Sequence, residues 1–165
     1  MNVNDLKNIV KKPNRVRHAY TQSINAMPDE VFPLLCPVRE LVWAPGWQTD
    51  WVISNSGVAE QGCVFQTSFE EDTAAATWVI SKHHPETYEV EMYKIIPQYT
   101  VMKLEASLTG DGKGGTLATI AYEFTPLSPE GEHFVESRTE DWYRNFMQGW
   151  ESAMNHYLAT GEMAA

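Results

Sequence analysis

The sequence has few of the features that mark secreted, cysteine-ligated or membrane-spanning proteins. It has only two cysteines in 165 residues. Cys36 and Cys63 are far apart and form no CxxC motif, so neither a disulfide framework nor a zinc site is expected. No apolar run approaches the roughly 20 residues of a membrane helix, and the first residues lack the apolar segment of a signal peptide. A cytoplasmic protein with no membrane insertion is therefore expected.

Basic side chains are scarce beyond residue 17. The part of the chain after Arg17 holds seven Lys and Arg residues against 21 Asp and Glu residues, and the net charge of the whole chain is −10. An acidic surface repels phosphate backbones and anionic lipid heads. Neither nucleic acid nor a membrane is an expected partner, and residues 1–14 are interpreted as a solvated arm or short helix.

Aromatic residues, in contrast, are abundant. Six Trp, seven Tyr and six Phe are many for this length, and such side chains can fill a core or line a cavity. A chain of this size can bury most of its apolar surface in one core without a metal or disulfide. Residues 15–162 are therefore expected to form a single domain that needs no cofactor.

Residue periodicity predicts a β-rich chain. Residues 15–24 read as a strand with His18 and Tyr20 on its apolar face. Pro28 is followed by acidic residues, which is typical of a helix start, and short helical pieces are expected through about Trp43. Short turns favour antiparallel pairing of the six strands that follow, predicted near 51–55, 62–70, 75–83, 87–96, 99–109 and 115–125.

The last predicted element is a long amphipathic helix over 129–159, starting at a Ser-Pro pair. Its apolar stripe pairs naturally with the apolar face of the sheet, and comprises Val135, Thr139, Trp142, Tyr143, Phe146, Trp150, Ala153, Met154 and Tyr157. Glycine is unfavourable inside a helix, so Gly149 predicts a close approach of another segment. The fold class is α+β: a seven-stranded antiparallel sheet wrapped around this helix, with two short helices after the first strand.

Three stretches resemble a known superfamily. They are Ile24-Asn25-Ala26-Met27-Pro28-Asp29-Glu30-Val31-Phe32, Gly115-Thr116 leading to Tyr122-Glu123-Phe124, and Gly149-Trp150 with Tyr157-Leu158 and Gly161 downstream. With the element order, they resemble the SRPBCC superfamily, the helix-grip fold of START domains and polyketide cyclases, over about residues 15–162. The stretch from Cys36-Pro37-Val38-Arg39-Glu40 to Trp43-Ala44-Pro45-Gly46-Trp47 resembles a bacterial branch of that superfamily.

The resemblance implies a cavity between the sheet and the final helix, of the kind that binds small molecules. The leading expectation is binding of one small hydrophobic or aromatic molecule. The side chains expected to contact it, from the face assignments, are His18, Tyr20, Trp47, Phe65, Trp78, Tyr88, Tyr122, Trp142, Phe146 and Trp150. A second copy of the chain, in a homodimer, is left open as a further partner.

Two other functions stay open. A cyclase, dehydratase or hydrolase could use His18 with Tyr20 or Tyr122 as acid and base. A module that binds a protein, such as a chaperone cofactor, would need an exposed apolar patch on the outer sheet face, where Lys103 and Glu105 are charged instead.

Several individual residues in the sequence are each consistent with two interpretations. Trp43, Trp47 and Trp51 form either a lid over the cavity or an anchor for their loop. Arg138, at the edge of the helix stripe, either faces solvent or clamps a ligand carboxylate. His83 and His84 are adjacent in a strand and point to opposite faces, so no metal site is expected there.

Overall fold

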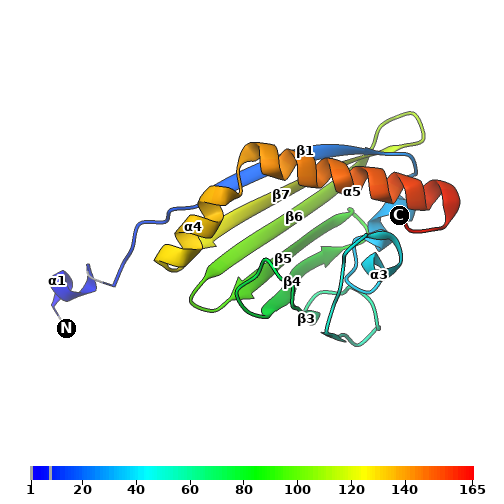
Figure 1. Ribbon diagram of the computed structural model, residues 1–165. Helices are drawn as coiled ribbons and strands as arrows, with labels where there is room; N and C mark the ends of the chain where they lie inside the picture. Colours follow the sequence, from blue (N-terminus) through cyan, green and yellow to red (C-terminus); the bar gives the residue numbers. More distant parts are fainter. Residues whose placement is uncertain (1, 8) are drawn as a thin grey trace.

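The computed structural model describes residues 2–7 and 9–165. Met1 and Asn8, which fall within the predicted arm, lie outside the described residues. Within the described chain a single antiparallel sheet has the strand order β1-β7-β6-β5-β4-β3-β2 (Figure 1). Its strands are β1 (Val16–Ile24), β2 (Trp51–Ile53), β3 (Val64–Thr67), β4 (Ala76–His84), β5 (Glu89–Ile96), β6 (Thr100–Gly110) and β7 (Thr116–Pro126). The seven-stranded antiparallel sheet predicted from the sequence is confirmed.

The two faces of the sheet differ as the alternation predicts. Along β6 the side chains of Leu104 and Ala106 are buried under the helices. Between them, Glu105 faces outward and lies 2.7 Å from the ammonium of Lys103 and 3.7 Å from the guanidinium of Arg17. Since successive strand residues point to opposite faces, the inner face packs the core and the outer face carries paired charges.

Strand β1 is an edge strand, and the C-terminal helix α5 (Glu140–Thr160) covers it. The main-chain N–H of Ser23 donates to the carboxylate of Glu151 at 2.7 Å, and that of Asn25 donates to the side-chain oxygen of Asn155 at 2.8 Å. An open strand edge invites pairing with another chain. Here the helix satisfies part of that edge and is fixed along β1.

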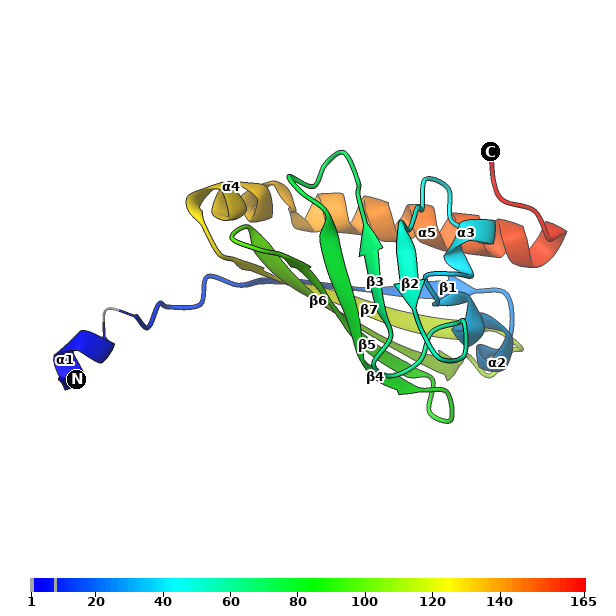
Figure 2. The same cartoon turned by 90° about the horizontal axis from the view of Figure 1, so that it is seen from below.

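Three short helices follow β1: α2 (Pro28–Val31), the 3-10 helix η1 (Phe32–Leu34) and α3 (Glu40–Trp43). Trp43 is fully buried, donates its indole N–H to the main-chain oxygen of Leu34 at 3.0 Å and packs edge-on against Trp150 at 5.3 Å between ring centroids. The two tryptophans therefore join α3 to α5, which Figure 2 shows lying over the same side of the sheet.

The prediction of one helix over 129–159 was wrong at one point. The structure has two helices, α4 (Pro129–Ser137) and α5, with a break at Arg138 and Thr139. Thr139 is the N-cap of α5, because its hydroxyl accepts from the N–H of Trp142 at 3.1 Å. A Thr followed by Glu140 and Asp141 is a helix start signal, so Thr139 was wrongly placed inside a continuous stripe.

The expectation for Gly149 was also wrong. A Cβ atom built on this residue would meet nothing within 4 Å. The buried face of α5 is centred on Tyr143, Met147 and Met154, and Gly149 lies about 120° from Tyr143 around the helix axis. The close approach occurs instead at Gly131 in α4, where a Cβ would lie 2.0 Å from the main-chain oxygen of Tyr99.

The N-terminal arm contains one short helix. Helix α1 (Val3–Leu6) has no buried residue, and residues 9–15 form an irregular segment that leads to β1, away from the body of the domain (Figures 1 and 2). Among the described residues, no helix has both the length and the apolar character needed to cross a bilayer.

Candidate functional site

A cavity of about 410 Å³ lies between the inner face of the sheet and helices α3, α4 and α5. Strand residues such as Val90, Met92, Met102, Leu104, Ala106 and Ile120 form its floor, and the rest of its wall is largely aromatic. The aromatic lining residues are Trp47, Phe65, Phe69, Trp78, Tyr122, Phe124, Phe134, Trp142, Phe146 and Trp150. An apolar space of this size with few polar groups is typical of a small-molecule site.

Seven of the ten residues predicted to contact a ligand line this cavity: Trp47, Phe65, Trp78, Tyr122, Trp142, Phe146 and Trp150. They come from β3, β4, β7, α5 and the loop after α3. The sheet register and the helix stripe bring six of them together, and the loop after α3 adds Trp47.

The other three, His18, Tyr20 and Tyr88, lie outside the cavity lining. His18 and Tyr20 do point to the inner side of β1, where α5 covers them: the His18 ring stacks on Tyr143 at 5.6 Å. Tyr88 follows the β4–β5 turn with a φ of 58°, and its ring packs against Phe32 at 5.9 Å. All three residues are partly buried by the protein itself and offer no surface to the cavity.

The three tryptophans spaced by four have three different roles. Trp43 anchors α3, as described above. Trp47 lines the cavity, and its indole N–H donates to the main-chain oxygen of Pro37 at 2.8 Å. Trp51 lies in edge strand β2 with 40% of its surface exposed. The two alternatives therefore both hold in part, since Trp43 fixes the loop and Trp47 covers one wall.

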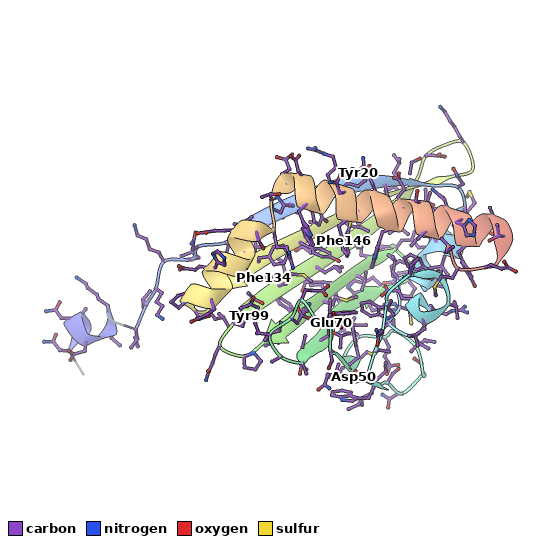
Figure 3. The ribbon with its side chains drawn as sticks, in the orientation of Figure 1. Tyr20, Asp50, Glu70, Tyr99, Phe134 and Phe146 are labelled. Carbon is purple, nitrogen blue, oxygen red and sulfur yellow. The ribbon has the colours of Figure 1, made fainter. Side chains whose placement is uncertain are left out.

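One wall of the cavity is formed by α5 itself. The rings of Trp142 and Phe146 stack with their centroids 5.3 Å apart and their planes 9° apart. Phe146 projects from α5 toward the sheet (Figure 3), yet it remains 37% exposed. A large apolar ring that is exposed and also lines a cavity marks the side where the cavity meets solvent.

Arg138 lies at the same end, in the break between α4 and α5. Its guanidinium carbon is 4.2 Å from the ring centroid of Phe134 and 4.5 Å from that of Trp142. Within the described chain no carboxylate lies within ion-pair distance of it. Cation–π contacts hold the guanidinium in the cavity lining. It therefore lies further inward than the solvent-facing position, which was one of the two placements predicted for Arg138.

A buried ion pair forms another part of the wall. The ammonium of Lys94, on β5, lies 2.9 Å and 2.7 Å from the two carboxylate oxygens of Asp72. The angles allow a hydrogen bond to Oδ1 alone, although both oxygens are within ion-pair distance. The ammonium also lies over the ring of Trp78 at 5.5 Å. Lys94 and Asp72 are 22 residues apart, so no local sequence signal indicates this pair.

Sequence reasoning also missed Glu40, the most unusual polar group in the cavity. Only 6% of Glu40 is exposed, whereas its neighbours Leu41 and Val42 are 43% and 48% exposed. Glu40 and Trp43 are three residues apart and share one face of α3, so burying Trp43 takes Glu40 inside with it. This i, i+3 spacing from a tryptophan was the only signal in the sequence that could have found it.

The surroundings of Glu40 favour its neutral form. Desolvation by burial raises the pKa of its carboxyl well above that of an ordinary glutamate. No lysine, arginine or histidine in the described chain forms an ion pair with it, and no hydrogen bond to its side chain is present there. A buried carboxyl without a neighbouring cation holds its proton more tightly. The protonated form of Glu40 is therefore favoured, and its O–H group can donate a hydrogen bond.

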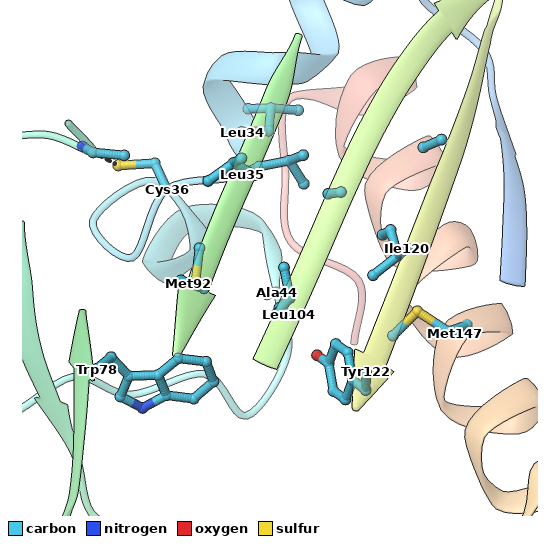
Figure 4. Packing of buried hydrophobic residues seen from close by; sticks show 14 of the residues in the cluster. Leu34, Leu35, Cys36, Ala44, Trp78, Met92, Leu104, Ile120, Tyr122 and Met147 are labelled. Carbon is cyan, nitrogen blue, oxygen red and sulfur yellow. Dashed lines mark hydrogen bonds between the residues drawn. The ribbon is translucent and has the colours of Figure 1, made fainter. Parts of the chain in front are cut away.

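Tyr122, on β7, is the second polar group at this inner end. It is 7% exposed. Burial raises the pKa of its hydroxyl well above the ordinary value, with smaller contributions from Tyr143 and from the charge of Glu40. In Figure 4 the hydroxyl oxygen points away from Met147 of α5. The phenol and the Glu40 carboxyl both belong to the cavity lining.

The described residues contain no group of three or more His, Cys, Asp and Glu side chains arranged to hold a metal ion. His83 packs its ring against Phe32 at 5.2 Å, while His84 lies 3.4 Å from the carboxylate of Glu86. The two adjacent imidazoles therefore have different protein partners.

Solved structures with the same architecture are numerous. Norcoclaurine synthase from Thalictrum flavum, solved in complex with dopamine and hydroxybenzaldehyde, aligns over 89% of this chain and 88% of its own, with a TM-score of 0.66 and 13% identity. The likeness shows that this chain has the same helix-grip fold. The helix grip predicted from the three sequence stretches is thus confirmed.

Two further helix-grip structures show how widely the match extends. The Zhui aromatase/cyclase from Streptomyces sp. R1128 aligns over 92% of this chain and 100% of its own, with a TM-score of 0.61 and 14% identity. Ara h 8.0201 aligns over 89% and 99%, with a TM-score of 0.60 and 14% identity. No model of a protein family matches the sequence, and no curated protein matches it either. At these identities the likeness establishes the helix grip, and function has to be argued from the cavity.

Proposed function

We propose that this protein binds one small hydrophobic or aromatic molecule in the cavity between the sheet and α5. The observation that supports this most directly is the cavity itself, about 410 Å³ in volume and lined mainly by aromatic and aliphatic side chains. The structurally similar norcoclaurine synthase and Zhui aromatase/cyclase, named for reactions of small molecules, also use a helix grip. Removing the apolar surface of a ligand from water would drive binding.

The lining also indicates the shape of the ligand. The stacked rings of Phe65 and Trp78, 5.3 Å apart, and those of Trp142 and Phe146 lie on the sheet and helix sides of the cavity. Flat aromatic surfaces stack favourably with planar ligands. A planar molecule with one or two rings is the best fit.

The test is the binding of a neutral dye, N-phenyl-1-naphthylamine, to the purified chain and to a variant with a filled cavity. Ala106 lies between Val90 and Ile120 on neighbouring strands, and all three line the cavity. Ala106→Phe would place a ring in the space that the ligand occupies. We expect the chain to bind one dye per molecule and the variant to bind at least about tenfold more weakly.

Gln148→Ala, on the exposed side of α5, is the control and should bind as the unmodified chain does. Circular dichroism and urea unfolding would show that Ala106→Phe is folded. Equal dye affinity in Ala106→Phe and the unmodified chain would contradict the proposal, as would the absence of dye binding by the unmodified chain.

The enzyme alternative now depends on different residues. His18 and Tyr20 lie outside the cavity lining, so of the three proposed acid and base groups only Tyr122 reaches it. Glu40 is the other proton-bearing group at this inner end. A cyclase or dehydratase built on this cavity would therefore use Glu40 and Tyr122.

A further inference from the structure

Two polar side chains of the cavity lining have no hydrogen-bond partner among the described residues. Glu40 and Tyr122 are each more than nine-tenths buried, and both line the cavity. In the described part of the chain, no donor or acceptor forms a hydrogen bond with the Glu40 carboxyl or the Tyr122 hydroxyl. Buried polar groups without partners are uncommon and cost stability.

Two other charged side chains of the cavity already have partners. The Lys94 ammonium pairs with Asp72, and the Arg138 guanidinium lies against two aromatic rings. Glu40 is different, because it is buried and no cation among the described residues pairs with it. A polar atom of a ligand would therefore gain the most binding free energy in the space beside Glu40 and Tyr122.

We propose that Glu40 and Tyr122 form a site for the carbonyl oxygen of an aromatic ketone, with the carboxyl and the phenol both donating to it. This proposal deepens the proposed function and rests on it. It assigns an orientation to the ligand: the carbonyl at the inner end between α3 and β7, and the ring system toward Trp142 and Phe146. A ketone oxygen has two lone pairs and can accept both hydrogen bonds.

The charges around the cavity favour a ketone over an amine. A protonated amine would pair with ionised Glu40, but both charges would have to leave water, which is costly even for a well-formed pair. The lining also carries two cations, Lys94 and Arg138, and two carboxylates, Asp72 and Glu71, so its charges balance while Glu40 is neutral. A neutral acceptor needs no change in the charge of the cavity.

A matched pair of ligands tests the proposal. In 2-isopropenylnaphthalene a CH₂ group replaces the carbonyl oxygen of 2-acetylnaphthalene, with nearly the same shape. Binding of both would be measured by quenching of tryptophan fluorescence. Glu40→Met should weaken ketone binding about tenfold, the value of one good hydrogen bond, and leave alkene binding equal or stronger. Glu40→Gln keeps an N–H donor and should keep most of the preference for the ketone.

A second measurement needs no variant. The carbonyl stretching band of bound 2-acetylnaphthalene should shift to lower frequency than in a hydrocarbon solvent, because two donors weaken the C=O bond. Tyr122→Phe should reverse part of that shift. A bound band at the hydrocarbon position would overturn the proposal even if Glu40→Met failed to fold.

The remaining outcomes separate this inference from the proposed function. If both ligands bind and Glu40→Met changes them equally, the cavity binds aromatic molecules but the carbonyl site is wrong. If the protein binds 2-(1-aminoethyl)naphthalene more tightly than the ketone, Glu40 is an anionic site and the inference is overturned. If none of the three binds, the proposed function fails and the carbonyl site with it.

Discussion

The imidazole Nε2 of His18 lies 2.6 Å from the main-chain oxygen of Arg138, at the break between α4 and α5. A carbonyl oxygen can only accept, so Nε2 carries the hydrogen and donates it. His18 thus connects edge strand β1 to the corner where the C-terminal helix was expected to be continuous. The corner in turn positions Arg138 and Trp142 in the cavity lining.

Replacing His18 with leucine should therefore loosen the corner. The variant loses one hydrogen bond and leaves the Arg138 carbonyl without its partner, and we expect a loss of about 1–2 kcal/mol in the free energy of unfolding. Hydrogen exchange should become faster at the first turn of α5, beginning at Glu140. Tyr20→Phe, on the same face of β1, removes a hydroxyl without a hydrogen bond in the described residues and should change neither measurement. Unchanged exchange in His18→Leu would mean that Thr139 alone holds the corner.

Two glycines in the C-terminal helices should respond oppositely to alanine. Gly149→Ala adds a methyl group to open space and removes the entropic cost of a helical glycine, so stability should rise by up to about 1 kcal/mol, or about 2–4 °C in Tm. Gly131→Ala would place its Cβ against the main-chain oxygen of Tyr99 and should lower Tm. Calorimetry of the two variants checks both signs, and a lower Tm for Gly149→Ala would contradict this account of α5.

The buried acid predicts a specific dependence of stability on pH. The pKa of Glu40 is raised in the folded state by burial, while in the unfolded chain it has the ordinary value of about 4.3. Between these two values the folded state holds a proton that the unfolded state has released. The contribution of Glu40 to stability should therefore be largest at low pH and decline as pH rises through that interval, by about 1.4 kcal/mol per pH unit.

Glu40→Gln removes this contribution. The variant should match the unmodified chain near pH 4 and become progressively more stable than it toward pH 8, as measured by urea unfolding. Tyr122, which also lines the cavity, has a raised pKa and stays neutral throughout this range. Glu136→Gln, on the exposed side of α4, is the control. Parallel stability curves for Glu40→Gln and the unmodified chain would show that Glu40 is ionised in the folded state.

The ion pair in the cavity wall should be strongly coupled. The Asp72 side chain has no exposed surface, so Lys94→Met would leave a buried carboxylate unpaired and should cost about 3–5 kcal/mol. Lys94→Met combined with Asp72→Asn should recover most of that loss, because no charge is then left unpaired. A double-mutant cycle in urea measures the coupling, and additive losses would contradict it.

The parts of the fold that follow from periodicity could be predicted from the sequence. Alternation along β6 and β7 identified the inner face, and the helix stripe placed Trp142, Phe146 and Trp150 against it. These segments are long, so one error in face assignment would conflict with many neighbouring residues.

The parts that depend on short segments could not be predicted in the same way. Helix α3 has four residues, too few for a periodic pattern that would place Glu40 on a buried face. The break at Thr139 depends on one N-cap against an otherwise continuous stripe. Asp72 and Lys94 are 22 residues apart, and nothing local indicates that they meet.

The way α5 is attached has a consequence for how this protein can change over evolution. The helix is hydrogen-bonded along β1 through Glu151 and Asn155, and the cavity lies on its other side. Substitutions at cavity positions such as Ala106 or Phe146 therefore leave that attachment intact. A lineage could exchange one ligand for another by altering these side chains alone, with the framework inherited unchanged.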